Sequence, residues 1–561
     1  MESLSLDLGK YQSAYTTALA DLDDNKVVQR IWGLDHTVWQ DSPVEIDNRL
    51  GWLTIMDTMT QDVDRMKMLA SALENEGYTN VLLIGMGGSS LAPEVFSFVF
   101  DESYGLGLNI LDSTDPSMVE NYAKILDLNT TAFIVATKSG GTAETLSGFK
   151  YFYNLLSDSY DGDKEAIGKH FIGITDPGSK LIGMSERYLF RALFINDPNI
   201  GGRYSVLSYF GLVPASLIGV DVPELLRRAQ EMGHNNNLLE VHKNYGAQLG
   251  TVMGALAEKG RDKLTIFASP ILANFGDWVE QLVAESTGKD GKGILPVVGE
   301  LIGSPDSYSD DRLFVYIKVA DDETYNASIE SLKHAGHPVV TLQLNGKYDI
   351  GGQFFLWEMA TSIASYFLKI HPFNQPNVEA AKNMARAKID DYMQTGKLEE
   401  LPVAVSDNGM QVIGATSADS VTSALKNFLA QAEDGAYISV HAYVPMTEET
   451  MDVLQHLQSK LRDTTKLATT IGFGPRFLHS TGQLHKGDAG KGLFIQFTAD
   501  KPLDVDIPDE AGSDDSGMSF GTLIDAQALG DRAALLDVDR KFIRLHLSDI
   551  NENLRTLIDS L

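Results

Sequence analysis

The sequence AFIVATKSGGTAETLSGFKYFYNLL, residues 132–156, predicts a buried strand, a hydroxyl-rich turn and a helix. Residues 133–136 form a short apolar run typical of a buried strand, and apolar residues recur at helical spacing from 146 to 156. Between these segments, Gly140 and Gly141 let the backbone turn tightly. The turn directs N–H groups toward the position in front of the helix, where an anion is stabilised.

This turn carries the groups that hold a phosphate monoester. Thr137, Ser139 and Thr142 supply three hydroxyl donors, and Lys138 supplies a cation. A capped helix in a doubly wound sheet has a similar start, because Thr142 followed by Glu144 also suits the first helical turn. For this segment alone, both interpretations stay open.

A second turn, in VLLIGMGGSSL at residues 81–91, repeats the order of strand, glycine-rich turn and helix. Gly88 and Ser89 lie in it. Ser90 stands where a dinucleotide fingerprint requires glycine, and the chain contains no GxxxxGK[ST] sequence, so neither a dinucleotide site nor a nucleotide P-loop is favoured.

Composition excludes several classes of function. The chain has 561 residues, a formal net charge of −32 and no cysteine. The acidic excess disfavours nucleic acid as a partner, since phosphate backbones are bound through an excess of Lys and Arg. The absence of cysteine excludes disulfides, thiolate nucleophiles and cysteine-ligated metals, and is compatible with a reducing cytoplasm.

The sequence predicts neither a secretory signal nor a membrane-spanning helix. The first 15 residues lack a basic region followed by an apolar segment, so we expect no secretory signal. The stretch 354–370 is the most apolar, but it contains Glu358 and is short for a membrane span, so we expect a buried helix there.

The order of predicted elements divides the chain into several parts. Strands alternate with helices through two successive parts, which predicts two doubly wound α/β domains with parallel sheets. A β-α-β-β-α-β order near the end predicts a C-terminal α+β, ferredoxin-like domain, in which the acidic run 502–516 is a solvated loop. The expected boundaries are 1–45 (helical segment), 46–225 (first α/β domain), 226–390 (second α/β domain), 391–408 (linker) and 409–561 (C-terminal domain).

Three charged residues outside the turns are candidates for chemistry. Arg203 follows two glycines in GGRYS, which suits an anion-facing guanidinium better than a surface ion pair. Glu285 ends a predicted helix, where the macrodipole disfavours a carboxylate, so it has either a local partner such as Lys289 or a chemical role. Lys382 lies two turns into a helix that begins near Pro376.

The motifs resemble those of the glucose-6-phosphate isomerase family, which is built from two sugar-isomerase (SIS) domains. The matching segments are IGMGGSSLAP, VATKSGGTAETL, GGRYS, AESTGK and NQPNVEAAK, in the family's order, between about residues 30 and 390. The whole chain also resembles the isomerase part of fused transaldolase–isomerase proteins. This resemblance implies interconversion of glucose 6-phosphate and fructose 6-phosphate without a cofactor, in a cytoplasmic homodimer that binds neither nucleic acid nor membrane.

The resemblance also implies roles for individual residues. Glu285 matches the base, Arg203 the arginine that stabilises the enediolate, and Lys382 the lysine that helps ring opening. The positions that match substrate-binding residues are Gly88, Ser89, Thr137, Lys138, Ser139, Thr142 and Gln375.

One departure concerns the ring-opening histidine, which the family carries in a segment resembling GExGTNGQH. Here Gly299 and Glu300 are followed by LIGSPDSYSDDR, which contains no histidine. We hypothesise that His485, in TGQLH, replaces it, because that loop partly resembles the missing segment. His479 and His371 are rivals, and a structural histidine is the alternative.

Three other functions compete. A dual phosphoglucose and phosphomannose isomerase is compatible with the same residues, because its substrates differ only at C2. A sugar-phosphate sensor would need the two turns but not Glu285. An aminotransferring isomerase is disfavoured, since the chain has no cysteine to release ammonia from glutamine.

Overall fold

The first sheet is parallel throughout and places both glycine-rich turns at one edge. The computed structural model describes residues 3–100 and 105–561. The strand order is β3-β2-β4-β5-β6, with every neighbouring pair parallel. Its strands are β2 (Asn80–Gly85), β3 (Gly107–Leu111), β4 (Thr131–Ala136), β5 (Phe171–Thr175) and β6 (Ala192–Ile195). Because the order reverses between β2 and β4, the turns that follow these two strands meet at the switch point where doubly wound sheets bind ligands.

Helices cover both faces of this sheet, so its central strands are buried. Every residue of β4 is buried, which explains the unbroken apolar run in the sequence. The helices of this first unit are α3 (Ile55–Asn75), α4 (Leu91–Val99), α5 (Pro116–Ile125), α6 (Ala143–Ser159), α7 (Lys164–Gly168), α8 (Lys180–Arg187) and α9 (Tyr209–Leu217).

The second sheet has the order β1-β10-β9-β7-β8. Four strands are parallel: β7 (Lys263–Ala268), β8 (Leu295–Val297), β9 (Arg312–Val319) and β10 (Val339–Leu344). The edge strand β1 (Ser3–Asp7) is antiparallel to β10, so the expectation of helices alone in residues 1–45 was wrong at this point. The helices of this second unit are α1 (Gln12–Asp24), α2 (Val27–Trp32), α10 (Val222–Asn236), α11 (Tyr245–Ala257), α12 (Phe275–Thr287), α13 (Asn326–His334) and α14 (Ile350–Leu368).

The third sheet corrects the ferredoxin-like prediction. Its order is β11-β12-β18-β15-β13-β14, and the last four strands in this order are all parallel to one another. A ferredoxin-like sheet is antiparallel, whereas this one is doubly wound with two antiparallel strands added at one edge. The strands are β11 (Val403–Asp407), β12 (Met410–Ile413), β13 (Tyr437–Tyr443), β14 (Ala468–Phe473), β15 (Gly492–Ala499) and β18 (Lys541–Leu547).

The physical reason lies in the connection between β14 and β15. This connection contains the 3-10 helix η10 (Arg476–His479) and α18 (Gly482–Gly487), and it crosses the sheet instead of turning back beside β14. A crossover of this length returns the chain parallel to its starting direction. The other helices of this third unit are α15 (Val378–Thr395), α16 (Val421–Leu429), α17 (Glu448–Thr465), α19 (Phe520–Asp537) and α20 (Ile550–Ser560).

The range expected to be a linker and the run expected to be a solvated loop are both partly structured. The range 391–408 includes the end of α15 and the strand β11, so it is not a bare linker. The acidic run 502–516 contains β16 (Asp506–Ile507), which pairs with β17 (Met518–Ser519), and it reaches the first unit. There Arg187 forms an ion pair with Glu510.

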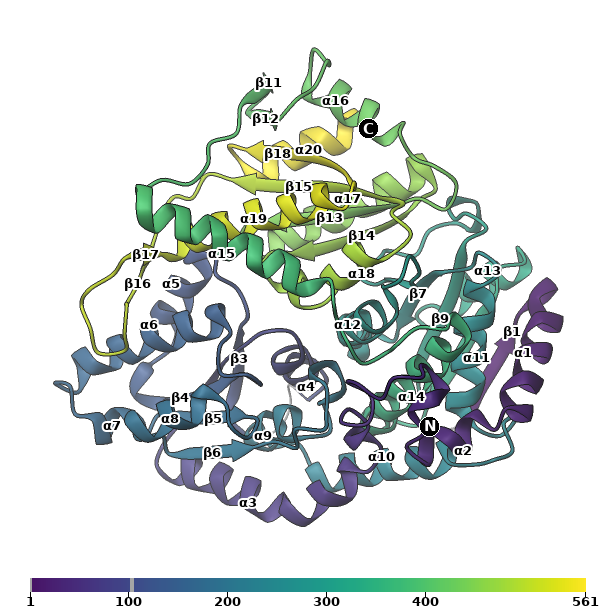
Figure 1. Cartoon of the computed structure of the whole chain (residues 1–561), viewed down its shortest axis with the longest axis horizontal. Helices are drawn as coiled ribbons and strands as arrows, with labels where there is room; N and C mark the ends of the chain where they lie inside the picture. Colours follow the sequence, from purple (N-terminus) through teal and green to yellow (C-terminus); the bar gives the residue numbers. More distant parts are fainter. Residues whose placement is uncertain (1–2, 101–104) are drawn as a thin grey trace.

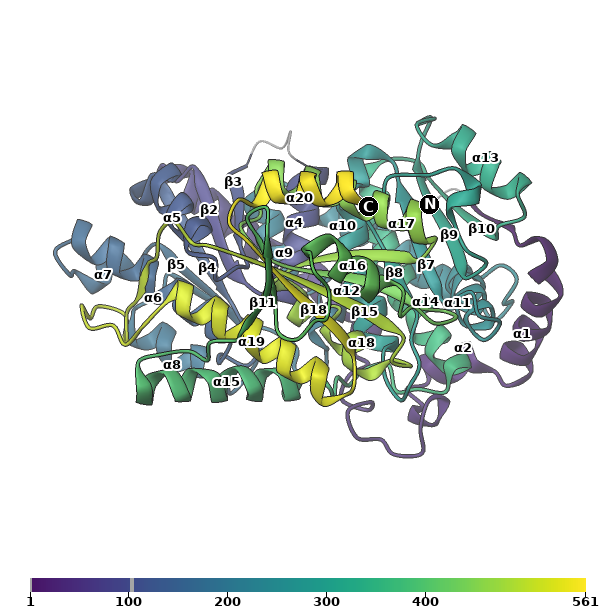
Figure 2. The ribbon, with the colours of Figure 1, turned by 90° about the horizontal axis from the view of Figure 1, so that it is seen from above.

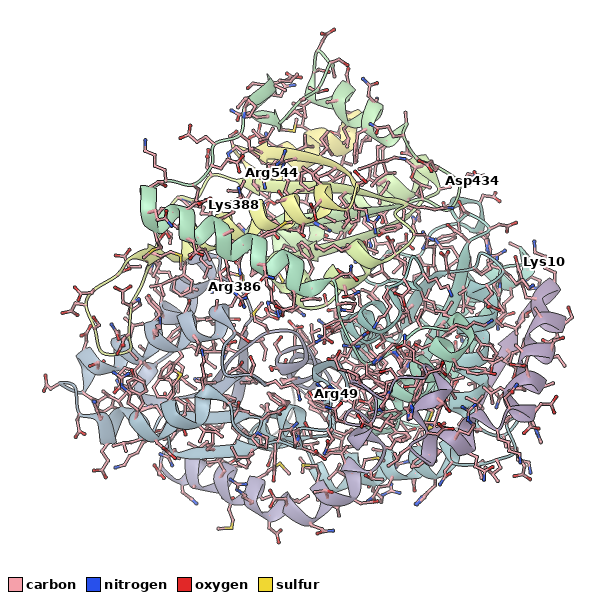
Figure 3. All side chains as sticks on the ribbon, in the orientation of Figure 1. Lys10, Arg49, Arg386, Lys388, Asp434 and Arg544 are labelled. Carbon is pink, nitrogen blue, oxygen red and sulfur yellow. The ribbon has the colours of Figure 1, made fainter. Side chains whose placement is uncertain are left out.

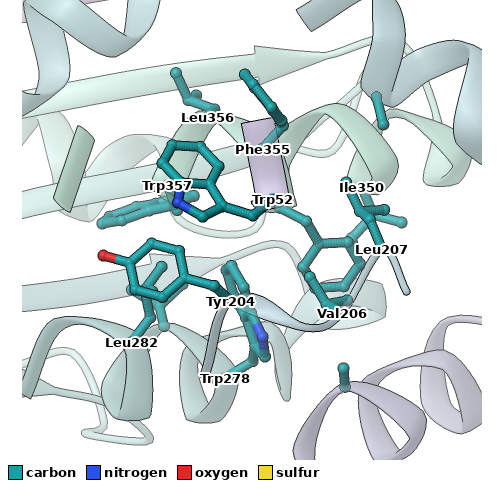
Figure 4. Close-up of a cluster of buried hydrophobic side chains, with 14 of the residues drawn as sticks. Trp52, Tyr204, Val206, Leu207, Trp278, Leu282, Ile350, Phe355, Leu356 and Trp357 are labelled. Carbon is teal, nitrogen blue, oxygen red and sulfur yellow. The ribbon is translucent and has the colours of Figure 1, made fainter. Parts of the chain in front are cut away.

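One hydrophobic core joins the first two units. It extends from Leu8 to Phe373 and includes the buried cluster of Trp52, Trp278 and Trp357, shown in Figure 4. Helix α14 runs through it and is buried along nearly its whole length, as the sequence predicted for residues 354–370. Among residues 3–100 and 105–561, no helix combines the length and the apolar character needed to cross a membrane.

The three units surround a common centre (Figure 1). The third unit lies at the top of that view, the first at the lower left and the second at the lower right, while α4, α12 and α18 point toward the middle. Seen from above, α15 and α19 run side by side along the first unit (Figure 2). The site lies where the three units meet.

Candidate active site

The turn after β4 forms a cradle of hydroxyl groups in front of α6. The hydroxyl oxygens of Thr137 and Thr142 lie 3.0 Å apart, and the N–H of Gly141 donates to the hydroxyl of Ser139 over 3.3 Å. Gly140 has φ +69°, and a Cβ there would come within 2.6 Å of the backbone nitrogen of Leu181. The sharp turn therefore requires glycine, as the sequence pattern indicated.

Lys138 is not part of this cradle. Its ammonium group forms a short ion pair with Asp176 and donates to the carbonyl of Ile200 over 2.7 Å. Its charge is therefore balanced within the first unit. The structure disfavours the expected direct contact between Lys138 and a phosphate.

The turn after β2 brings the arginine segment into place. A Cβ on Gly88 would lie 2.1 Å from the carbonyl oxygen of Gly202, so only glycine permits this close approach. Ser89, the next residue, is buried. Gly88 thus fixes the backbone position of the residue that follows Gly202, which is Arg203.

The Arg203 guanidinium is buried and held on several sides. Its Nε donates to the hydroxyl of Ser286 over 2.7 Å, and its Nη1 donates to Oε1 of Gln375 over 3.0 Å. Nη2 donates to the carbonyls of Pro372 and Asn374. A guanidinium fixed in this way presents a positive charge of defined direction.

Glu285 lies beside this guanidinium, on the last turn of α12. Its Oε1 is 3.5 Å from Nη1 of Arg203, and its Oε2 accepts a hydrogen bond of 3.2 Å from Gln281. Lys289, the local partner considered from the sequence, donates instead to the carbonyls of His371 and Asn374. Arg203 therefore supplies the positive charge next to Glu285.

Gln281 is a residue that the sequence reasoning missed. Its Nε2 donates both to Glu285 and, over 2.8 Å, to the backbone carbonyl of His479 in the third unit. The signal was present, because Gln281 precedes Glu285 by four residues and so lies on the same helical face.

A cavity of about 210 Å³ lies beside the cradle. Ser139 and Thr142 line one side, Lys382 and Arg386 of α15 another, and His479 a third. Figure 3 shows Arg386 on α15, between the first and the third unit. Lys382 is partly exposed, and its Nζ lies 3.6 Å from Oε1 of Glu379. The residues lining this cavity do not include Arg203 and Glu285, which are linked to it through Gln281 and His479.

The structure contradicts the hypothesis for His485. This side chain is fully buried in the third unit, where its ring packs against the rings of His441 and Phe494 and its Nε2 lies 3.3 Å from the hydroxyl of Ser439. Burial lowers the pKa of His485 well below its usual value, so the ring stays neutral. It lies in the core of its own unit and cannot reach a sugar.

The two rival histidines differ. His371 accepts a hydrogen bond from the N–H of Phe373 at Nδ1, and its Nε2 lies 3.1 Å from the carbonyl of Val44. Burial lowers the pKa of His371 to about 4. Both ring nitrogens of His371 are thus engaged with the backbone, whereas His479 lines the cavity beside the cradle and its side chain is 16% exposed.

Known isomerases resemble this chain in sequence. Residues 41–294 match the family model described as phosphoglucose isomerase. The chain is 27% identical over 460 residues to a glucose-6-phosphate isomerase from Prochlorococcus marinus, covering 72% of this chain and 84% of the relative. It is 28% identical over 384 residues to a probable glucose-6-phosphate isomerase from Methanococcus maripaludis, covering 61% and 84%.

Two solved structures are similar in fold. A glucose-6-phosphate isomerase from Chlamydia trachomatis superposes with a TM-score of 0.59 at 16% identity, covering 70% of this chain and 89% of that one. A hypothetical protein from Thermus thermophilus gives a TM-score of 0.58 at 23% identity, covering 69% and 100%. The chain therefore resembles phosphoglucose isomerases in sequence over residues 41–294 and glucose-6-phosphate isomerases over a longer range, and it is similar in fold to the two solved structures.

Proposed function

We propose that this protein interconverts glucose 6-phosphate and fructose 6-phosphate, with Glu285 as the base. One observation carries the proposal: the Glu285 carboxylate lies 3.5 Å from the buried Arg203 guanidinium, and the glycine-rich turn after β2 closely approaches the backbone of Gly202 and Arg203. The relatives named as glucose-6-phosphate isomerases support the same reaction.

The phosphate group binds at the cradle of residues 137–142. There it accepts hydrogen bonds from the hydroxyls of Ser139 and Thr142 and from N–H groups in front of α6, whose helix dipole favours an anion. This end of the sugar takes no part in the reaction. Its binding energy therefore orients C1 and C2 against Glu285 and Arg203.

Glu285 moves one proton between neighbouring carbons. In the aldose-to-ketose direction, its carboxylate takes the proton from C2, the C–H electron pair forms the C1–C2 double bond, and the negative charge moves to O1. The resulting carboxylic acid gives the proton to C1 while the proton on O2 passes to O1, which leaves a ketone at C2. A single carboxylate serves as both base and acid.

Arg203 stabilises the intermediate enediolate. Its guanidinium is fixed by Ser286, Gln375 and two carbonyl groups, so it needs little reorganisation as charge develops. Gln281 orients the Glu285 carboxylate through a hydrogen bond. A carboxylate and a fixed cation suffice for this proton transfer, so the proposal includes no cofactor.

Of the competing functions, a pure sensor explains the site least well. Binding a sugar phosphate needs the cradle but not a carboxylate held beside a buried guanidinium. Isomerisation of mannose 6-phosphate as well is compatible with the same proton transfer, because the two aldoses differ only at C2. The homodimer and the cytoplasmic location implied by the resemblance stay predictions.

The test is a coupled assay of fructose 6-phosphate with EDTA present. We expect the wild type to turn over and Glu285→Gln to lose about a thousandfold in kcat, within the usual range for general acid–base groups. Glu449→Gln, an exposed carboxylate on α17, is the matched control and should keep full activity. Normal turnover by folded Glu285→Gln would contradict the assignment, and turnover of mannose 6-phosphate would establish the dual activity.

A further inference from the structure

His479 reaches the site from the third unit and touches two parts of it at once. Its backbone carbonyl accepts a hydrogen bond from Gln281, the residue that orients Glu285. Its ring Nε2 lies 3.0 Å from Oε1 of Glu144, in the first turn of the helix that follows the cradle. One residue therefore spans the distance between the reacting end and the phosphate end of the site.

Glu144 holds the imidazole ring in a defined orientation. Its Oε1 also accepts a hydrogen bond of 2.7 Å from Gln527 of α19, and the other end of Gln527 accepts one of 2.7 Å from Thr114. Burial alone would raise the pKa of Glu144, but the charge and hydrogen bond of His479 bring that pKa below its usual value. Glu144 is thus an ionised, buried acceptor.

The protonation of the ring follows from this partner. An ionised carboxylate only accepts hydrogen bonds, so Nε2 of His479 carries a proton. In the neutral ring, Nδ1 then has the lone pair. Within the described part of the chain, no residue hydrogen-bonds Nδ1, which leaves this nitrogen for a ligand in the cavity.

The segment where the family carries its histidine serves a different purpose here. Gly299 and Leu301 present their carbonyls to Gln455 and Arg462 of α17, and Glu300 lies buried between Arg462 and Arg312. This segment therefore docks the third unit and does not face the sugar. The docked unit, in turn, inserts η10 and His479 into the site.

We propose that His479, oriented by Glu144, is the acid–base group that opens the sugar ring, so that the third unit completes the active site within one chain. The proposal rests on the function proposed above. It assigns His479 as a catalytic residue and Glu144 as a positioning residue.

The proton balance of ring opening is simple. The C1–O5 bond of the pyranose breaks, and O5 takes the proton from Nδ1 of the imidazolium. The O1–H bond breaks at the same time, its electrons form the C1 carbonyl, and its proton passes to water. A proton from water then returns to Nδ1, so the group is regenerated and no co-reactant is consumed.

Ring opening is measured separately from isomerisation as the interconversion of the α and β anomers of glucose 6-phosphate, by exchange NMR. We expect His479→Gln to slow enzymatic anomerisation by about a hundredfold. Glu285→Gln should lose isomerisation but keep anomerisation. His456→Gln, an exposed histidine on α17, is the matched control and should change neither rate.

Folded His479→Gln that keeps anomerisation within twofold of the wild type would overturn the proposal. Wild-type protein that anomerises the sugar without isomerising it would refute the proposed function while supporting this inference.

A second pair of variants covers the case in which His479→Gln does not fold. Glu144→Gln keeps an oxygen acceptor for Nε2, and Glu144→Ala removes it. We expect the anomerisation rate of Glu144→Gln to be about tenfold higher than that of Glu144→Ala. Equal rates in the two variants would contradict the positioning role.

Discussion

The first two units and the third unit contribute to the site in different ways. The first two supply the cradle, Arg203 and Glu285 from the ends of strands and helices, each within a motif that is recognisable in the sequence. The third supplies His479 from η10, a single turn in a crossover connection. His485, six residues further along, is buried in the core of that unit. The difference shows that a loop rich in histidine does not reveal which of its histidines faces a ligand.

The largest effect is expected in the part of the site built by the first two units. Arg203→Lys keeps the positive charge but removes the planar guanidinium, which donates to Ser286 and Gln375 at the same time. We expect kcat for isomerisation to fall about a hundredfold, because the enediolate loses a fixed donor. Steady-state kinetics checks this, and a change confined to KM would contradict the role of Arg203.

Where the third unit docks, the expected effect is on stability and not on turnover. Glu300→Gln leaves the buried guanidinium groups of Arg312 and Arg462 without their shared carboxylate. We expect the free energy of unfolding to fall by about 3 kcal/mol, the cost of breaking a buried ion pair. Chemical denaturation measures it. A loss below about 1 kcal/mol would show that this cluster does not hold the third unit in place.

The stability of the folded protein should also depend on pH, because two carboxyl groups with raised pKa values lie at the boundary between the units. Burial raises the pKa of Asp277 to about 7 and that of Glu280 to about 8, in a cavity of about 520 Å³ that they share with Arg476 of η10. In the unfolded chain these two carboxyl groups lose their protons above about pH 4, whereas in the folded protein they keep them up to about pH 7 to 8. The free energy of unfolding therefore falls as the pH rises toward 8.

Denaturation at pH 5 and pH 8 tests this sign. The wild type should be less stable at pH 8, and Glu280→Gln should reduce the difference because it removes one of the two titrating groups. An unchanged difference in the variant would show that Glu280 is not responsible.

The smallest effect on activity is expected at the second histidine. His485→Phe replaces a buried, neutral ring with another ring in the third unit, where His441 and Phe494 surround it. We expect both isomerisation and anomerisation to stay within twofold of the wild type. A selective loss of anomerisation would reverse the assignment of His479 and His485.

The sequence predicted most of the fold because its strands are short, apolar and buried. The run 133–136, expected to be a buried strand, lies within β4, and the buried helix expected at 354–370 overlaps α14. The parallel direction of β15 was missed, since strand order alone does not show whether the connection through α18 crosses the sheet. Strand β1 was missed because it is an edge strand that pairs with β10, more than 300 residues away in the sequence.

In the candidate site too, local features could be predicted from the sequence and long-range contacts could not. Residues within local motifs, such as Gly88 and Arg203, could be proposed from the sequence because the turn geometry and the motif depend on neighbouring residues. Gln281 and His479 could not be joined from the sequence, because their contact spans 198 positions and depends on how two units dock. Lys138 was expected to contact the phosphate, but its ammonium group forms an ion pair with Asp176, which lies in the loop after β5.

Proton transfer by Glu285 is tested most directly by incubating fructose 6-phosphate with the enzyme in D₂O and following deuterium at C1 and C2 by NMR. The account predicts incorporation by the wild type and by His485→Phe, and a rate about a thousandfold lower in Glu285→Gln. Incorporation by folded Glu285→Gln at the wild-type rate would contradict it.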